Sequence, residues 1–252
     1  MILNYKIYGN KSNENSILLI HGYLSSHEHF KFQINELVRN NFCVYCIDMP
    51  GHGLNKEVLL PNMTSFAESM IETINFLELK NFSLLGHSMG GMLSIEIAVT
   101  ISEQINKLIC YGTAASGNLK NRFETFEQSR DRVKKDYTTF KKMAHAKWFY
   151  KGENDKYFDL CYNSGKDISI SSAINSLNVM ETFNAKDRIS NIKNKTLIMY
   201  GDSDKTYGLD DILFLKYHIE KSSLCVLPRC GHSPHLEKVE LFNQILIDFL
   251  KN

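Results

Sequence analysis

The chain has 252 residues, of which 43% are hydrophobic and 23% charged, and a length near 250 residues is compatible with one large α/β domain. Lys and Arg total 29 against 28 Asp and Glu, for a formal net charge of +1. This balance gives no support to a nucleic acid or an anionic membrane as partner. We therefore expect one folded domain whose partner is a small molecule.

The start of the chain carries no recognisable export signal. Residues 1–6 lack the basic segment, the long apolar segment and the small-residue cleavage site of a secretory leader. Apolar runs such as Ile17–Ile20 are also far too short to span a bilayer. We expect a soluble cytoplasmic protein with no membrane span.

Short apolar runs typical of β-strands recur along the chain, and most of them are continuous rather than alternating. Continuous runs indicate strands that are buried on both faces, as in a parallel sheet. In chain order the runs are Ile2–Tyr8, Ser16–Ile20, Cys43–Ile47, Phe82–Leu85, Lys107–Tyr111, Thr196–Tyr200 and Leu224–Leu227.

Segments with the periodicity of amphipathic helices lie between these runs. The second of them follows a capping box predicted at Ser65 and Glu68. The three clearest stripes are Phe30, Ile34, Leu37 and Val38; Phe66, Met70, Ile74 and Leu77; and Val239, Phe242, Ile245, Leu246 and Phe249. Strands that alternate with helices predict an α/β fold with a doubly wound, mainly parallel sheet, whose chemistry lies at the carboxyl ends of the strands.

The alternation lapses over residues 117–185, where no strand-like run occurs and the sequence is polar, helical in character and rich in aromatic residues. A stretch of this length is better explained as an inserted helical cap than as a loop. The sequence thus divides into a core of residues 1–116 and 186–252 and a cap of residues 117–185. The aromatic side chains can form the core of the cap, line a pocket, or do both.

The segment Gly86-His87-Ser88-Met89-Gly90 has the G-x-S-x-G pattern, between a predicted strand and the helical stretch Met92–Ile101. Strand, tight turn and helix are the context that a nucleophilic serine requires. Side chains at Gly86 and Gly90 would crowd the neighbouring backbone of such a turn. We predict that Ser88 is the nucleophile and that the Met89 amide, at the helix N-terminus, donates to an oxyanion.

Five segments together resemble the α/β-hydrolase superfamily, in its order and from the first strand to the last helix. Within that superfamily they are similar to the branch of small serine esterases and carbon–carbon hydrolases. The segments are Ile20-His21-Gly22-Tyr23, Asp48-Met49-Pro50-Gly51-His52-Gly53, Gly86-His87-Ser88-Met89-Gly90-Gly91, Gly201-Asp202-Ser203-Asp204 and Gly231-His232-Ser233-Pro234-His235-Leu236-Glu237. The predicted cap carries nothing that matches.

The resemblance implies that His21 and Gly22 turn the chain so that the Tyr23 amide gives the second oxyanion donor. Two aimed N–H groups are what a tetrahedral intermediate needs. We expect the His21 side chain only to brace this turn, and His52 to brace the loop that contains it.

A serine hydroxyl needs an adjacent base, which in turn needs an orienting acid. In this fold the order along the chain is Ser, acid, His, and the family pattern assigns Asp204 as the acid and His232 as the base. Asp202 is the rival acid and is expected to turn the loop, whereas His235, the rival base, is expected to pack at the start of the last helix. The proline that the family often has after the acid is missing here.

The predicted reaction is hydrolysis of a small or medium carboxylic ester through an acyl-enzyme. One alternative is a carbon–carbon hydrolase or lyase with the same triad, whose carboxylate substrate would need a fixed arginine. A second alternative is a non-catalytic ligand-binding receptor. The candidate arginines in or beside the cap are Arg122, Arg130, Arg132 and Arg188.

We expect no cofactor and no metal ion. Histidines His27, His29, His145 and His218 are scattered, and no H-E-x-x-H pattern occurs. The pair Cys43 and Cys46 lies on a predicted strand, where residues three apart point to opposite faces. We expect reduced cysteines.

Overall fold

In the computed structural model, which describes residues 1–13, 15–119 and 124–252, the strands form one sheet in the order β1-β3-β2-β4-β5-β6-β7. All neighbours pair in parallel except β1 and β3, which are antiparallel. This confirms the predicted fold class. The bounds are β1 (Tyr5–Tyr8), β2 (Ser16–Ile20), β3 (Cys43–Ile47), β4 (Phe82–His87), β5 (Ile105–Tyr111), β6 (Lys195–Gly201) and β7 (Ser222–Leu227).

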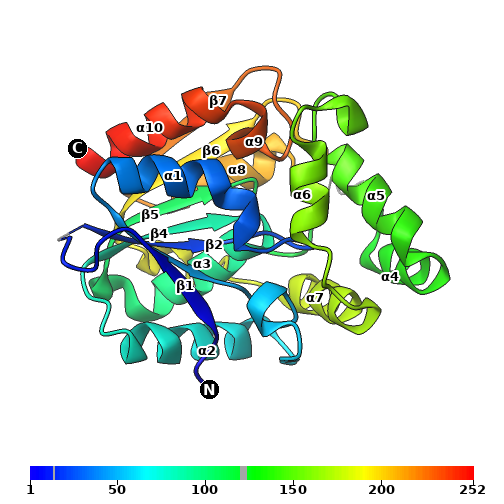
Figure 1. The fold of residues 1–252 in the computed structure, drawn as a ribbon, viewed down its shortest axis with the longest axis horizontal. Coiled ribbons are helices and arrows are strands. Elements are labelled where there is room, and N and C mark those ends of the chain that lie inside the picture. The colour runs from blue at the N-terminus through cyan, green and yellow to red at the C-terminus, as the bar shows by residue number, and fades with distance from the viewer. Residues whose placement is uncertain (14, 120–123) are drawn as a thin grey trace.

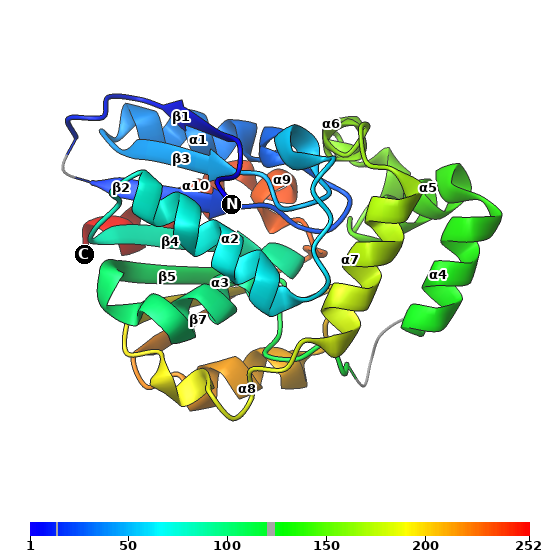
Figure 2. The same cartoon turned by 90° about the horizontal axis from the view of Figure 1, so that it is seen from below.

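Helices cover both faces of this sheet (Figures 1 and 2). One face carries α1 (Lys31–Arg39) and α10 (Val239–Lys251), and the other carries α2 (Met63–Phe76), α3 (Met89–Ile101) and α8 (Leu209–His218). The remaining short helices are η1 (His27–Phe30), η2 (Gly53–Asn55), η3 (Ser102–Gln104), η4 (Gly152–Asn154), η5 (Ile189–Asn191) and α9 (Pro234–Glu237). Within the described ranges, no helix combines the length and apolar character that crossing a membrane requires.

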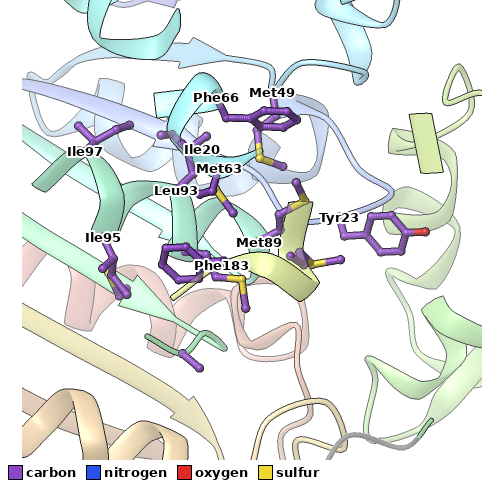
Figure 3. Close-up of a cluster of buried hydrophobic side chains, with 14 of the residues drawn as sticks. Ile20, Tyr23, Met49, Met63, Phe66, Met89, Leu93, Ile95, Ile97 and Phe183 are labelled. Atoms are coloured by element: carbon purple, nitrogen blue, oxygen red, sulfur yellow. The ribbon is translucent and has the colours of Figure 1, made fainter. Parts of the chain in front are cut away.

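Continuous apolar strands are explained by burial on both faces of the sheet. Every residue of β3 and β4 is buried, and two hydrophobic clusters lie on the opposite sides. Cys43 belongs to the cluster under α2 and α3, whereas Cys46 belongs to the one under α1 and α10. Figure 3 shows part of the first cluster, where Ile20 of β2, Phe66 of α2 and Leu93 of α3 lie together.

Two local predictions were wrong. The first strand begins at Tyr5 rather than Ile2, because the Leu3 amide donates to Thr73 Oγ1 (2.9 Å) and the segment before the strand packs on α2. Helix α2 is capped by Asn62, whose side chain accepts from the Ser65 amide (2.9 Å). Ser65 therefore lies inside the helix, and its predicted capping box does not form.

A segment of helices separates β5 from β6 and lies at the carboxyl ends of the strands (Figure 2). It contains α4 (Phe126–Lys135), α5 (Tyr137–Lys147), α6 (Phe158–Ser164) and α7 (Ile170–Thr182), and we call it the α4–α7 segment. Its two ends lie side by side, since the Gly117 amide donates to Phe183 O (2.9 Å) and the Ala185 amide to Ala115 O (2.8 Å). The segment therefore leaves the sheet and returns to it at one place.

Candidate active site

Ser88 lies in the tight turn between β4 and α3. Its backbone has φ 56° and ψ −119°, a left-handed conformation that costs free energy in any residue with a side chain and is typical of functional turns. A Cβ atom at Gly90 would overlap the carbonyl oxygens of Ile20 and His21. The turn can pack this closely against β2 only with glycine at that position.

Further hydrogen bonds fix the backbone of Ser88. Its amide donates to Tyr111 O (3.0 Å), and its carbonyl accepts from the Thr113 hydroxyl (2.7 Å) and from the Gly91 amide (2.9 Å). Sequence analysis missed Thr113, because nothing in the residues after β5 marks a partner for the turn. The side chain of Ser88 is thus carried on a rigid support.

His232 and Asp204 are brought together from the loops after β7 and β6. Nδ1 of His232 lies 2.8 Å from Oδ2 of Asp204, and both side chains are fully buried. The second carboxylate oxygen of Asp204 accepts from the Thr206 amide (2.7 Å). When Nδ1–H donates to this carboxylate, Nε2 of His232 presents a lone pair. That nitrogen is buried and has no hydrogen-bond partner in the described part of the chain.

Asp202 and His235, the alternative acid and base of the sequence analysis, lie outside the pair formed by His232 and Asp204. Asp202 is exposed, and its Oδ1 accepts from the Ser203 hydroxyl (2.8 Å) and the Cys230 amide (3.2 Å), which joins the loop after β6 to the loop after β7. His235 is fully buried in α9, and burial lowers its pKa to about 3. The structure therefore pairs His232 with Asp204 and not with Asp202.

The turn after β2 lies directly against Ser88. A Cβ atom at Gly22 would lie 2.9 Å from Nδ1 of His87 and 3.2 Å from Cβ of Ser88. The Tyr23 hydroxyl donates to Ala173 O of α7 (3.1 Å), so this ring points toward the α4–α7 segment (Figure 3). Met89 is the first residue of α3. The two predicted oxyanion donors thus belong to two segments that adjoin the serine.

Buried polar side chains hold this turn against the loop after β3. Nε2 of His21 accepts from the Met49 amide (3.0 Å), while Nδ1 donates to Gly22 O (2.8 Å). Asp48 accepts from the backbone and the ring of His27 and from the Leu54 amide. Burial would raise the pKa of Asp48, but the hydrogen bonds from His27 and from the Leu54 amide lower it to about 2. His52 donates to Pro50 O (3.0 Å), and burial lowers its pKa to about 3.

A cavity of about 30 Å³ lies beside Ser88, enough for about one water molecule. The α4–α7 segment closes it on one side with apolar side chains, and no charged side chain lines it among the described residues. The lining residues are Tyr23, Ser88, Phe140, Ala144, Trp148, Met180, Thr206 and Tyr207. Of the aromatic residues in the segment, Phe140 and Trp148 line the cavity, whereas Phe149 and Phe158 pack on each other (6.1 Å between ring centroids).

Trp148 and Tyr207 contact the predicted base itself. The Trp148 carbonyl accepts from the amides of His232 (2.8 Å) and Ser233 (3.1 Å), and the Tyr207 ring stacks on that of His232 at 5.5 Å and 22°. Sequence analysis counted Trp148 only among the aromatic residues that form the core of the cap or line a pocket, and it gave Tyr207 no role. The only available signal was that Trp148 is the one tryptophan of the chain.

Three of the four candidate arginines lie in the described part of the chain, and they do not line this cavity. Arg130 pairs with Glu181 (2.5 Å), Arg132 with Glu124 (3.0 Å) and Arg188 with Glu96 (2.7 Å). None of the three lines the cavity, and Arg122 lies outside the described residues.

Comparison with known proteins finds a matching family and several similar proteins. The family model described as "alpha/beta hydrolase fold" matches residues 15–239. A 2-hydroxy-6-oxononadienedioate/2-hydroxy-6-oxononatrienedioate hydrolase from Comamonas testosteroni is 25% identical over 274 residues, covering 99% of this chain and 92% of its own. An esterase from Exiguobacterium antarcticum has a TM-score of 0.89 at 23% identity, over 98% of this chain and 95% of its own. An enol-lactonase from Burkholderia xenovorans has a TM-score of 0.88 at 17% identity, over 99% and 96%.

Proposed function

This chain belongs to the alpha/beta hydrolase fold family, and on that premise we propose that it is a serine hydrolase that cleaves a small or medium uncharged carboxylic ester. The observation that carries this proposal is the composition of the Ser88 cavity. It joins a serine in a strained turn to an apolar wall without a charged side chain among the described residues. The buried Asp204–His232 pair supplies the proposed base, and two residues that contact His232, Trp148 and Tyr207, also line the cavity.

The proposed reaction begins when Nε2 of His232 removes the proton from Ser88 Oγ as this oxygen attacks the ester carbonyl carbon. The tetrahedral intermediate collapses, the carbon–oxygen bond of the ester breaks, and His232 returns the proton to the departing alcohol. Water then attacks the acyl-enzyme, with its proton taken by His232 and returned to Ser88, and the carboxylic acid leaves. Asp204 acts as a positioning residue, because it fixes the ring of His232 and stabilises its protonated form.

We assign the oxyanion site to the amides of Tyr23 and Met89. The close approach of the Gly22 turn to Ser88 supports this assignment, as does the position of Met89 at the N-terminus of α3. Backbone donors on rigid segments need little reorganisation during the reaction, and each is worth roughly 10²–10³ in rate.

We assign residues 117–185 as a cap that selects the substrate. Four of the residues around the cavity come from this segment: Phe140, Ala144, Trp148 and Met180. A buried carboxylate without a cationic partner costs several kcal/mol, so an uncharged acyl group suits this wall better than an acidic one. Since about 30 Å³ does not hold an ester, the cap has to move to admit the substrate.

A second candidate is cleavage of a carbon–carbon bond in a ketone-bearing acid by the same triad. The name of the Comamonas testosteroni relative, which hydrolyses an oxo-dienedioate, favours it. This reaction needs a cation for the substrate carboxylate, and the pairing of Arg130, Arg132 and Arg188 with acidic side chains argues against it.

Release of p-nitrophenol from acetate, butyrate and octanoate esters tests the proposal. We expect turnover by the wild type and by Ser171→Ala, which removes an exposed serine of the cap, and no turnover by folded Ser88→Ala. A fluorophosphonate should label Ser88. Hydrolysis of a 2-hydroxy-6-oxo-dienoate without ester turnover would instead establish the second candidate, and absence of both turnover and labelling would refute the serine mechanism.

A further inference from the structure

Three buried histidines meet behind the nucleophile, although they are far apart in sequence. His29 lies in η1, His87 at the end of β4 and His235 in α9. One ring nitrogen from each lies within 4.8 Å of those of the other two, and the ring centroids are 4.6–5.4 Å apart. We propose that the cluster of His29, His87 and His235 binds a divalent transition-metal ion, with zinc as its natural occupant.

The hydrogen-bonding state of the rings is the main support. Both ring nitrogens of His29 and of His235, and Nδ1 of His87, are buried without a hydrogen-bond partner among the described residues. Each buried polar atom left unsatisfied costs about 1–3 kcal/mol. Several such atoms facing one another are therefore expected to share a ligand that satisfies them together.

His87 is already oriented as a metal ligand. Its Nε2 lies 2.9 Å from the carbonyl oxygen of His232, so Nε2 carries the proton and Nδ1 presents a lone pair. Histidines that bind metals almost always donate their other N–H to a carbonyl or carboxylate in this way, which fixes the tautomer and the ring orientation. Here the oxygen comes from the backbone of the predicted catalytic base.

The donor set selects the class of ion. Three imidazoles suit Zn²⁺, Cu²⁺, Ni²⁺ and Fe²⁺, whereas Ca²⁺ and Mg²⁺ prefer oxygen ligands. Zn–N bonds of about 2.0–2.1 Å in a tetrahedral site bring the nitrogens to roughly 3.3 Å from one another. The rings of His29 and His235 have no hydrogen bond to lose when they turn toward the ion, while His87 holds its position.

The three ligands would join the three turns that surround the active site. His87 directly precedes Ser88, His235 follows His232 by three residues, and His29 follows the turn that contains Tyr23. The ring of His87 lies 4.8 Å from that of His232 and stacks on Tyr111. None of the three is a member of the proposed triad, so the ion would be structural and would tie these turns together beneath the reacting atoms.

The test is zinc content and thermal stability of the full chain. Chelator-treated protein is unfolded, refolded with Zn²⁺ to let the ion reach a buried site, dialysed and analysed for metal. We expect one zinc per chain, and a rise in Tm of about 5 °C or more at saturating zinc. His29→Gln and His235→Gln should each weaken binding by about 100-fold or more, because loss of a ligand costs at least as much as loss of its hydrogen-bond partner. His145→Gln, at a fully buried histidine of α5, and His218→Gln, at a histidine of α8, should bind as the wild type does.

Two further measurements separate this site from others. Zinc binding should persist after a fluorophosphonate has blocked Ser88. This result would show that the zinc ion is not bound at His232, next to the blocked serine. Should the variants fail to fold, Co²⁺ in the wild type should give the visible absorption of a tetrahedral nitrogen site. Zinc that is not retained, affinity that is unchanged in His29→Gln and His235→Gln, or Co²⁺ without these bands would overturn the proposal. Each outcome is independent of ester turnover.

Discussion

The turns after β2, β4 and β6 line the same cavity as the α4–α7 segment, but turns and segment contribute to the site in different ways. In the turns, the decisive features are the left-handed conformation of Ser88 and the close approach permitted by Gly90, which belong to the backbone, and the short side-chain contact between His232 and Asp204. The α4–α7 segment contributes side-chain volume, through Phe140, Trp148 and Met180. We infer that the turns determine whether a bond is broken, and that the segment determines which substrate is accepted.

The largest effect should follow from changing the orienting acid. Asp204→Asn keeps the size of the side chain but removes the charge that stabilises protonated His232, and it favours the wrong ring tautomer. We expect kcat for p-nitrophenyl butyrate to fall about 10⁴-fold. Asp202→Asn, in the same loop, keeps a side-chain oxygen that can accept from Ser203 and Cys230 and leaves the partner of His232 in place, so it should retain activity within a factor of a few. Equal losses in the two variants would contradict the assignment of the acid.

The next largest effect should come from charge on the substrate. A p-nitrophenyl hemiester of succinate has the same acyl length as the butyrate ester and adds one carboxylate. Because the described wall is uncharged, kcat/KM for the hemiester should be lower by about 10²-fold or more. Arg130→Gln should leave this ratio unchanged, since Arg130 pairs with Glu181. A preference for the hemiester would favour an acidic substrate and the second candidate reaction.

Asp48 supports the turns without taking part in the proposed reaction. Its pKa of about 2 in the folded protein lies below its ordinary value of 3.8, so its contribution of about 2 kcal/mol is present above pH 4 and disappears as the pH falls through 2. Asp48→Asn should therefore lower the free energy of unfolding by about this amount at pH 7. In urea titrations, the difference in free energy of unfolding between this variant and the wild type should decrease from pH 5 to pH 2. Asp187→Asn, at an exposed position, should show no such decrease.

The same contrast explains how far the sequence could predict the molecule. The strands were found because burial on both faces leaves continuous apolar runs, and the turn at Ser88 because its sterics demand glycines at fixed spacing. The start of β1 and the cap of α2 were misplaced, because the competing partners, Thr73 and Asn62, satisfy backbone groups in ways that periodicity does not encode.

Contacts between segments that are distant along the chain could not be predicted from the sequence. Trp148 accepts a hydrogen bond from the His232 amide through its backbone carbonyl oxygen. Every residue type has this carbonyl group, so the sequence does not mark the contact. His29, His87 and His235 have no spacing that suggests a shared ligand, and the expectation of no metal rested on that spacing. The three rings come together only in the fold, where residues of β4, η1 and α9 lie close to one another.

A side-chain change in the α4–α7 segment should alter substrate preference without altering chemistry. Phe140→Ala opens the cavity beside Ser88, so kcat/KM for the octanoate ester should rise about tenfold relative to that for acetate, as expected for a few further buried methylenes. Phe158→Ala is the matched control, because this buried aromatic of α6 packs on Phe149 and Tyr162 and does not line the cavity. Both variants should lose stability through the space they create, but only Phe140→Ala should change the chain-length profile. The same shift in both would mean that loosening of the segment, and not the shape of its wall, selects the acyl group.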